Sequence, residues 1–390
     1  MIPCVPLGEL CDIVVGRTPA RANPAYWGPG EPWLSITDMN QGSDIATTRE
    51  QITATGAAKG KRVFPGTVLL SFKLSIGKVG IARVPLFTNE AIAALPIKDP
   101  ARLDSGYLVR ALAAVDWRGR SNRAAMGVVL NKAKLQTIPI PLPPIEEQRR
   151  IAAILDQADA IRTKRRQVLA HLDALTQSTF HALFGDPTGG DWELAPLGEV
   201  VERIDNGASP NCEARPARPD EWGVLKLGAV TYGTFRAGEN KAYLGQLGGM
   251  SLNEVRPGDV LMTRKNTREL VGAVAVVDDV RPRLLLPDLI FRLELDRARV
   301  DPRYFQAMMM SERVRAAVRG LSSGSAASMP NISKARLRTL TIGLPPIRLQ
   351  RQFDSRVAAI NAQRALIGHA RAADDELFAS LQSRAFGGEL

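Results

Sequence analysis

The sequence predicts a mixed α/β (α+β) protein with two similar domains, joined by two long antiparallel coiled-coil helices in a pseudo-two-fold internal repeat. Three observations predict this fold class. The same motifs occur twice in the same order, each copy opens with short apolar runs and Pro-Gly turns, and each closes with a long segment of helical apolar spacing. With 390 residues, the chain is long enough for two or three domains with cores of their own.

The repeat is clearest at the two ends of each copy. PLGELCDIVVG starts at Pro6, and PLGEVVERIDNG starts at Pro196, 190 residues later. LPPI starts at Leu142 and again at Leu344, 202 residues later. The growth in this offset predicts loop insertions of a few residues in the second copy, which surface loops tolerate.

A third motif pair lies between these ends. VFPGTVLLSFKLSIGKVGIA returns as VRPGDVLMTRKNTRELVGAVAV, with Pro65 matching Pro257 at an offset of 192 residues. We expect this offset to hold as far as Gly80 and Gly272. Apolar stretches such as TVLLSF and GAVAVV predict strands in both domains.

The first long helix is predicted from its start and its end. Pro143-Pro144 followed by Glu146 and Glu147 suits a helix N-terminus, because proline needs no N–H partner there and carboxylates favour the positive end of the helix dipole. Phe184-Gly185, with a proline soon after, predicts the end. The second copy ends in the same way, at Phe386-Gly387, but begins with LPPIRLQ and so lacks the two acids.

The two helices have equal predicted lengths, which favours a pairing between them. The glycine follows the second proline by 41 positions in both copies, at 185 after 144 and at 387 after 346. Such a helix spans roughly 60 Å, too long for the core of a small domain. A helix with a single apolar stripe needs a partner, and the order of the chain makes a pair of these two helices antiparallel. The alternative is that each helix packs on its own domain as a linker.

This interpretation divides the chain into four parts. They are a first domain (1–142), a central helix that acts as spacer (143–186), a second domain (187–344) and a distal helix that pairs with the first (345–390). Apolar residues at steps of three, four and seven mark the predicted seam between the helices. The seam residues are Ile151, Leu155, Ala158, Ile161, Leu169, Leu172, Phe353, Val357, Ile360, Ile367 and Leu377.

The net charge of +11 indicates a polyanionic partner, because lysine and arginine that neutralise phosphates release condensed counterions. No window of the sequence is apolar enough for a membrane helix, and MIPCVPLGEL lacks the features of a signal peptide. We therefore expect a cytoplasmic protein without membrane contact. Cys4, Cys11 and Cys212 have no ligand spacing, so we expect reduced thiols and no metal site.

Two basic domains on a helical spacer suit duplex DNA, whose backbone has two-fold axes and whose half-sites lie roughly 34–36 Å apart per helical turn. Because the two domains differ in sequence, we expect a bipartite, asymmetric target with an unread gap. The competing hypothesis is a non-catalytic cytoplasmic scaffold that bridges two partner proteins through the same domains.

Candidate DNA contacts lie where both copies place basic or small polar residues near strand ends and in loops. Ser71 and Lys73 align with Thr263 and Lys265, and alternate residues share one face of a strand. Arginine can read guanine and asparagine can read adenine, although half or more of protein–DNA hydrogen bonds go to phosphate and sugar. Ordinary solvated surface is the alternative for each of them. The candidates are Ser71, Lys73, Lys78, Arg118, Arg120, Arg123, Lys132, Thr263, Arg264, Lys265, Arg268, Arg319, Ser322, Ser323, Asn331 and Lys334.

A search for catalytic motifs finds none, so we assign no catalytic residue. His171, His181 and His369 fall in the predicted long helices, away from any cluster of acids or cysteines. GAAKGKRV lacks the glycine spacing and the Ser or Thr of a phosphate loop. LPPI has leucine and isoleucine where the Asn/Asp-Pro-Pro-Tyr motif of amino-methyltransferases has polar groups. An enzyme with an unseen site is therefore the least favoured class, and we expect a chain that recognises while a partner does the chemistry.

The duplicated PLGE starts, the Pro-Gly strands and above all IPLPPIEEQRRIA with its long helix ending in FG resemble the specificity subunit of type I restriction–modification enzymes. The resemblance covers nearly the whole chain. It implies two target-recognition domains, one for each half of a bipartite DNA site. It also implies that the long helices dock modification (methyltransferase) subunits, usually two, to which restriction subunits add.

The resemblance places the cofactors elsewhere. It implies that S-adenosylmethionine and ATP with magnesium belong to the partner subunits and that this chain holds none. One departure from the pattern concerns the second helix start, where Arg348 and Leu349 replace the two acids of the first. The resemblance therefore does not imply that the two helix starts dock partners symmetrically.

Overall fold

The computed structural model describes residues 2–73, 75–117, 122–124, 127–187, 189, 192–322 and 329–390. Within these ranges the chain forms two units of mixed α/β structure. Unit 1 runs to Arg166 and resumes at His369, and unit 2 runs from Gln167 to Gly368. Each long helix thus contributes to both units, so the four domain borders drawn from the sequence remain a prediction.

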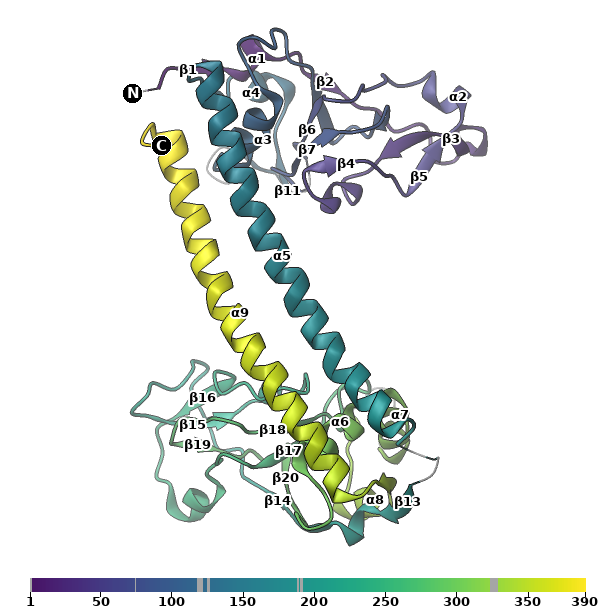
Figure 1. The fold of residues 1–390 in the computed structure, drawn as a ribbon, viewed down its shortest axis with the longest axis vertical. Coiled ribbons are helices and arrows are strands. Elements are labelled where there is room, and N and C mark those ends of the chain that lie inside the picture. The colour runs from purple at the N-terminus through teal and green to yellow at the C-terminus, as the bar shows by residue number, and fades with distance from the viewer. Residues whose placement is uncertain are drawn as a thin grey trace. The chain divides into compact units, whose positions relative to one another are not determined.

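Unit 1 is built on a five-stranded sheet with the order β2-β9-β6-β7-β4 and a three-stranded sheet with the order β5-β3-β8 (Figure 1). In addition, β1 pairs with β12 and β10 pairs with β11. The strands are β1 (Cys4–Pro6), β2 (Val14–Val15), β3 (Trp27–Leu34), β4 (Asp44–Ile45), β5 (Glu50–Ile52), β6 (Val68–Ser71), β7 (Val79–Ala82), β8 (Phe87–Thr88), β9 (Ile92–Leu95), β10 (Asn122–Ala124), β11 (Gly127–Val129) and β12 (Pro139–Pro141). The short 3-10 helices are η1 (Pro24–Tyr26) and η2 (Asp38–Gln41).

Helices cover this sheet and complete the core of unit 1. Alternate residues of β6 belong to different clusters, since Val68 and Leu70 pack with Tyr107 of α3 whereas Leu69 packs with Ile45. Both faces of the strand are therefore buried, which explains its continuous apolar sequence. The helices are α1 (Leu7–Leu10), α2 (Ala54–Ala57), α3 (Ser105–Ala113), α4 (Lys132–Gln136), the first part of α5 (Ile145–Phe184) and the last part of α9 (Ile347–Gly387).

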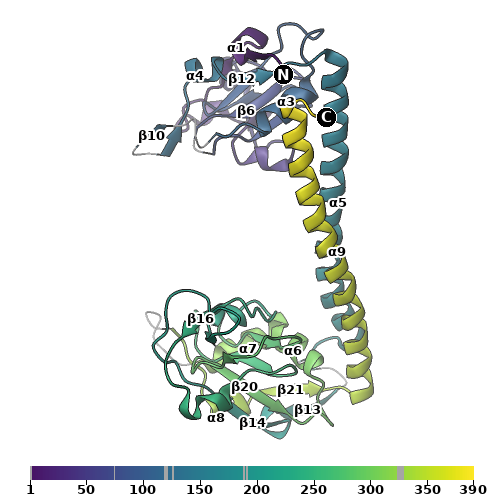
Figure 2. The same ribbon diagram turned by 90° about the vertical axis from the view of Figure 1, so that its left-hand side faces the viewer.

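Unit 2 repeats this plan with a four-stranded sheet, β14-β20-β17-β18, and a three-stranded sheet, β16-β15-β19 (Figure 1; Figure 2 gives a second view of β14, β16 and β20). Strand β17 again divides its side chains, with Val260 and Met262 in one cluster and Leu261 in another. The strands are β13 (Glu193–Pro196), which pairs with β21 (Thr341–Leu344), β14 (Val201–Asn206), β15 (Trp222–Leu225), β16 (Asn240–Tyr243), β17 (Val260–Thr263), β18 (Val274–Val276), β19 (Leu284–Leu285) and β20 (Ile290–Leu295). The helices are η3 (Leu197–Glu199), η4 (Leu227–Ala229), η5 (Gly248–Asn253), α6 (Pro302–Met310), α7 (Glu312–Leu321) and α8 (Lys334–Arg338), with the remaining parts of α5 and α9.

The strand register corrects one detail of the predicted repeat. Leu70 pairs with Val79 between β6 and β7, and Met262 pairs with Val274 between β17 and β18. The offset between copies is therefore 192 residues before the connecting loop and 195 after it, so the loop of the second copy is three residues longer. The sequence alone predicts this insertion after Gly80 and Gly272, which is too late, because both copies carry several glycines and valines there.

The true counterpart of Gly272 is Gly77, and the predicted match of Gly272 with Gly80 is wrong. Gly77 and Gly272 have φ angles of 91° and 78°, a region that glycine adopts without strain. Their N–H groups donate to the carbonyls of Ser71 and Thr263 at 2.9 and 2.8 Å. The same turn therefore closes two loops of different length.

The long helices pair in antiparallel directions within each unit. In unit 1, Arg162 forms an ion pair with Asp375 at 2.7 Å, and Arg165 forms one with Asp374. In unit 2, Arg364 pairs with Asp173 at 2.6 Å. Partner numbers on α9 fall as those on α5 rise, as antiparallel packing requires. None of the helices in the described ranges combines the length and the apolarity that a membrane span needs.

An aromatic cluster anchors the helices in unit 2. Phe180 and Phe184 near the end of α5 contact Phe353 near the start of α9, with ring centroids 5.6 Å apart in both pairs. Tyr304 of α6 completes the cluster, 4.8 Å from the ring of Phe184. Such aromatic pairs bury large apolar areas and add edge-to-face attraction.

We expect Phe184→Ala to destabilise unit 2 by about 3–5 kcal/mol, because the buried ring leaves a cavity that the cluster cannot fill. The measurement is urea unfolding followed by circular dichroism. Leu175→Ala on the same helix is the matched control, because this side chain is half-exposed, and it should cost less than about 1 kcal/mol. Equal losses in both variants would contradict the anchoring role.

Candidate nucleic-acid interface

The connecting loop between β6 and β7, and its counterpart between β17 and β18, hold the central candidates. Ser71 and Thr263 are fully buried, so the prediction that they contact DNA is wrong. The Ser71 hydroxyl donates to Ser75 O and accepts from Lys78 N, and the Thr263 hydroxyl donates to Leu270 O and accepts from Ala273 N. Both hydroxyls instead close the loops from inside.

A bulky side chain from another part of the unit packs against the turn glycine of each loop. A Cβ at Gly77 would lie 2.5 Å from the Trp117 ring, which follows α3, and a Cβ at Gly272 would lie 2.3 Å from Val318 of α7. Only glycine permits these close approaches. Trp117 is itself fixed, because its indole N–H donates to Leu112 O at 3.1 Å. The two loops are therefore contacted by different neighbours, Trp117 in unit 1 and Val318 in unit 2.

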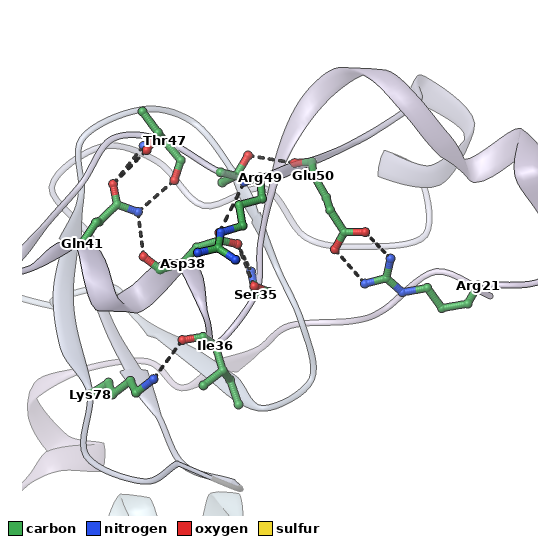
Figure 3. A network of polar contacts seen from close by, with 10 residues as sticks. Arg21, Ser35, Ile36, Asp38, Gln41, Thr47, Arg49, Glu50 and Lys78 are labelled. Atoms are coloured by element: carbon green, nitrogen blue, oxygen red, sulfur yellow. Dashed lines mark hydrogen bonds and ion pairs between the residues drawn. The ribbon is translucent and has the colours of Figure 1, made fainter. Parts of the chain in front are cut away.

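In unit 1 the loop carries two of the predicted basic residues. Lys73 is half-buried, and its Nζ lies 5.3 Å from the centroid of the Phe72 ring. Lys78 donates from Nζ to Ile36 O at 3.2 Å and so ties the loop to the segment that follows β3 (Figure 3). Lys78 therefore has a structural role. Its ammonium group has two further hydrogens that could bind a phosphate, so the DNA contact of Lys78 stays a prediction.

The segment tied by Lys78 is itself ordered by a polar network around Asp38 (Figure 3). The buried Asp38 carboxylate accepts from Ser35 N at 2.9 Å and from Ser35 Oγ at 2.7 Å. Gln41 Nε2 donates to Asp38 O at 2.8 Å and to Thr47 O at 2.9 Å. The network fixes the backbone between β3 and β5 beside the candidate loop.

An arginine fixes the outer part of this region. Arg21 stacks over the Trp27 ring, with its guanidinium carbon 3.8 Å from the ring centroid, and forms a two-fold ion pair with Glu50 (Figure 3). The hydrogen bonds from Arg21 hold the pKa of the Glu50 carboxyl below its ordinary value. Because Arg21 is stacked and paired, it is less available to a DNA phosphate than a free arginine.

In unit 2 the first residue of the loop, Arg264, is held by contacts within the unit. Arg264 donates from Nε to Asn331 Oδ1 at 3.3 Å and from Nη1 to Asp288 O at 3.4 Å, and its guanidinium lies over the Phe291 ring. Arg264 and Asn331, both predicted DNA contacts, are thus brought together by contacts with each other. Lys265 bridges to Asn331 through the backbone and lies beside them, half-buried.

The rest of the second loop is held by hydrogen bonds with Thr231 and Arg315. Asn266 donates from Nδ2 to Thr231 Oγ1 at 3.2 Å, which ties this loop to the segment after β15 as Lys78 ties the first loop to the segment after β3. Arg315 of α7 is buried and donates to Val271 O at 2.8 Å and to Glu269 O. Burial lowers the pKa of Arg315 from its ordinary value. Arg268 remains exposed at the tip.

The start of α4 lies close to the first loop, and the start of α8 lies close to the second loop. Leu130 N donates to Phe72 O at 3.1 Å, and Ile332 N donates to Arg264 O at 2.9 Å. These bonds place the exposed Lys132 and Lys334, the first residues of α4 and α8, near the loops. This proximity unites candidates that are far apart in the sequence.

The remaining candidates are placed as follows. Arg319 is half-buried near the end of α7, and its carbonyl accepts from the hydroxyl of Ser322 at 2.7 Å. Arg123 lies in strand β10. Arg118, Arg120 and Ser323 lie outside the residues that the structure describes.

Sequence reasoning missed the residues that support the loops from behind, namely Trp117, Asn266 and Arg315. ERVRAAVRG reads as an exposed helix with alternating arginines. One signal was available, because Arg315 lies one and three residues from Val314 and Val318, both of which are fully buried. An arginine on the apolar face of a short helix indicates an internal hydrogen-bonding role.

The predicted seam residues are buried near the ends of the helices and more exposed near their middle. Ile151 and Leu155 are buried in unit 1, and Ala158 is half-buried. Ile161 is 43% exposed and Leu377 is 55% exposed. In unit 2, Leu169, Leu172 and Ile367 are half-buried, whereas Phe353, Val357 and Ile360 are buried.

A shallow apolar groove lies between the two helices in unit 1. Ile161 and Leu377 face it from opposite helices, and Asp374 and Gln157 supply its polar edge. The groove is lined by Ile154, Gln157, Ala158, Ile161, Asp374, Leu377 and Leu381. Half-exposed apolar side chains of this kind suit contact with another protein.

The described residues contain no group of three or more histidine, cysteine or acidic side chains arranged to hold a metal ion. Burial raises the pKa of the Cys11 thiol to about 12, which keeps it protonated and unreactive. Cys4 is exposed and Cys212 is half-buried, and both are free thiols.

Comparison with known proteins agrees with this geometry. The family model described as the type I restriction modification DNA specificity domain matches residues 4–171. The type I restriction enzyme EcoEI specificity subunit of Escherichia coli is 33% identical over 160 residues, which are 41% of this chain and 27% of the relative. The EcoKI specificity subunit of Escherichia coli K12 is 22% identical over 384 residues, which are 92% of this chain and 82% of the relative.

The fold is shared with a solved structure. The type I restriction–modification S subunit from M. genitalium has a TM-score of 0.62 at 13% identity, with 98% of this chain and 95% of that chain covered. The chain spans only about a quarter of the length of the EcoEI relative, but the EcoKI match and the shared fold extend over both copies of the repeat. Residues 4–171 thus match the type I DNA specificity domain, and the chain is similar over nearly its whole length to specificity subunits of type I restriction–modification systems.

Proposed function

We propose that this chain is the sequence-specific DNA-recognition subunit of a type I restriction–modification complex, with no catalytic residues of its own. One α/β unit binds each half of a bipartite site, and the helix pair docks methyltransferase subunits, and through them restriction subunits. S-adenosylmethionine, ATP and magnesium belong to those partners. The chain works in the cytoplasm, where its DNA lies.

The observation that carries this proposal is the duplicated loop. Both units build the loop on the same strand pair, close it with a buried hydroxyl and a glycine of positive φ, and tie it to the same neighbouring segment. A duplicated basic loop with the same internal bonds supports two DNA contacts of the same kind. Each bond already made within a loop lowers the conformational entropy that the loop loses on binding, which favours specific recognition.

The difference between the loops supports unlike half-sites. The second loop is three residues longer and carries Arg268 at its exposed tip, whereas the first carries Lys73 and Lys78. A longer loop with arginine can reach farther toward base edges, where arginine binds guanine with two hydrogen bonds. We therefore propose an asymmetric target with a gap between its halves.

The groove in unit 1 supports the proposed docking of a partner. It presents apolar side chains of both helices at one place, next to ion pairs that fix the helices. A partner that fills this groove would bury Ile161 and Leu377, which the chain alone leaves half-exposed. The apolar centre and charged edge are typical of protein interfaces.

The central test is to express the chain with its methyltransferase partner and to map DNA methylation across the genome. We expect methylation at one asymmetric motif with two blocks separated by a fixed gap. The chain alone and in the complex should also bind duplex DNA less tightly as salt rises, because phosphate contacts release counterions. A flat salt response without sequence-specific methylation would favour the scaffold instead.

We expect the double variant Lys73→Ala and Lys265→Ala to weaken binding to all duplexes and to lower the slope of log affinity against log salt by about 2, because two phosphate contacts are lost. Fluorescence anisotropy at several salt concentrations measures this slope. The control is Lys98→Ala with Lys226→Ala, which removes the same charge from lysines that already face Asp12 and Glu239. An unchanged slope in the first variant would remove Lys73 and Lys265 from the interface.

We expect Ile161→Asp with Leu377→Glu to weaken methyltransferase binding about tenfold or more, because charge would enter the apolar centre of the interface. The affinity is measured by titration of the partner against the purified chain. Leu366→Glu, which changes an exposed leucine of α9 outside the groove, is the control. If the double variant binds the partner as tightly as the control and the wild type do, the docking site lies elsewhere.

A further inference from the structure

A buried glutamine lies in the first turn of each long helix. Gln148 of α5 has no exposed surface. Its side-chain Nε2 donates to Arg102 O and to Pro143 O, both at 2.8 Å, and its Oε1 accepts from Asp104 N at 2.9 Å. All the hydrogen-bonding directions of the NH₂ group are used, so the helix start is bonded to the proline segment and to the loop before α3.

The second copy repeats this arrangement atom for atom. Gln350 of α9 is also fully buried. Its Nε2 donates to Arg299 O at 3.0 Å and to Pro345 O at 2.7 Å, and its Oε1 accepts from Asp301 N at 2.9 Å. In both copies the glutamine therefore makes the same three hydrogen bonds. It bonds to two carbonyl oxygens and one backbone N–H, which belong to the proline segment and to the segment before the domain helix.

The repeat of these bonds does not follow from a constant chain length. Gln148 and Pro143 have counterparts 202 residues later, whereas Arg102 and Asp104 have counterparts only 197 residues later. The chain between the two partners is therefore five residues longer in the second copy, and the bonds are nevertheless the same. Their geometry is preserved across an insertion, which indicates a constraint on the junction itself.

Further bonds brace the same junction. The Tyr107 hydroxyl donates to Pro141 O at 2.7 Å, and the Tyr304 hydroxyl donates to Gly343 O at 2.8 Å, just before each proline pair. The Asp104 carboxylate accepts from Tyr107 N at 2.9 Å and so caps α3. The glutamine, tyrosine and aspartate thus connect the strand before the proline pair, the domain helix and the long helix through hydrogen bonds.

We propose that Gln148 and Gln350 are positioning residues that set the direction in which each long helix leaves its α/β core, and thereby set the gap length that the chain accepts between half-sites. The inference rests on the proposed function. Over a helix of 40 residues, a small change of angle at the first turn is amplified at the far end. A bipartite site with a fixed gap requires that this angle be fixed.

Only glutamine satisfies this junction. Its amide offers two hydrogens to the two carbonyls and one oxygen to the backbone N–H. Glutamate has the same shape, but its carboxylate would face the carbonyls of residues 102 and 143 without a donor. Methionine has a similar length but leaves all three backbone groups buried and unsatisfied, which is costly.

The test uses the complete chain in complex with its methyltransferase subunits. The methylated motif of the wild type, read from the genome, gives the native site. Methylation rates are then measured on synthetic duplexes that carry the native gap or a gap one base pair shorter or longer. We expect Gln148→Glu and Gln350→Glu each to lower the ratio of native-gap to altered-gap rates about tenfold, because the junction loses two donors. The bases required within each half-site should not change.

Gln352→Glu is the control, because it introduces the same charge on an exposed side chain of α9, two residues from Gln350, and should keep the wild-type ratio. Thermal unfolding of each complex establishes that it is folded. A folded Gln148→Glu or Gln350→Glu complex with the wild-type ratio would overturn the positioning role and leave the proposed function intact. If the wild type methylates no bipartite motif, the proposed function itself fails and the inference fails with it.

A gentler variant covers the case in which the glutamate variants do not fold. Tyr107→Phe with Tyr304→Phe removes only two hydroxyl groups from the same junctions and keeps both rings in the core. We expect a smaller loss of gap discrimination in the same direction. An unchanged ratio in this folded variant would overturn the proposal.

Discussion

The structure depends on the burial of both ends of each long helix. A helix of 40 residues with one apolar stripe is not stable in water by itself, so each end must find a core. Ile151 and Leu155 bury the start of α5 in unit 1, and Phe180 and Phe184 bury its end in unit 2. Helix α9 does the reverse, from Phe353 onward. Neither unit has a complete core without the helix that begins in the other.

The two copies agree where the chain is buried and differ where it is exposed. The buried hydroxyl, the turn glycine and the glutamine junction recur with the same bonds, although the connecting segments differ in length by three and five residues. A buried polar group that loses its partner costs about 1–3 kcal/mol, whereas an exposed loop can change with little effect on stability. The scaffold is therefore fixed by its internal bonds, and the loops are free to differ.

The sequence was sufficient to predict the repeat, the antiparallel helices and the position of the candidate loops, because apolar periodicity and proline or glycine boundaries are local signals. It was not sufficient to separate surface from interior among small polar residues. Ser71 beside Lys73 looks like a DNA contact, yet its hydroxyl is buried in a turn that three-dimensional packing creates. The apolar spacing likewise predicts that Ile161 and Leu377 lie in the seam between the helices, whereas both remain half-exposed because the helices form a groove there.

The helix starts show which force holds the junctions. Helix α5 begins with Glu146 and Glu147, which favour the helix dipole and pair with Arg149 and Arg150 three residues on. Helix α9 has Arg348 and Leu349 at the same places and lacks this contribution of about 0.3–1 kcal/mol. It nevertheless forms the same first turn, since the buried amide of its glutamine satisfies groups whose loss would cost more, about 1–3 kcal/mol. The internal bonds therefore determine the junction, and the surface charge of each helix start is free to differ according to what binds there.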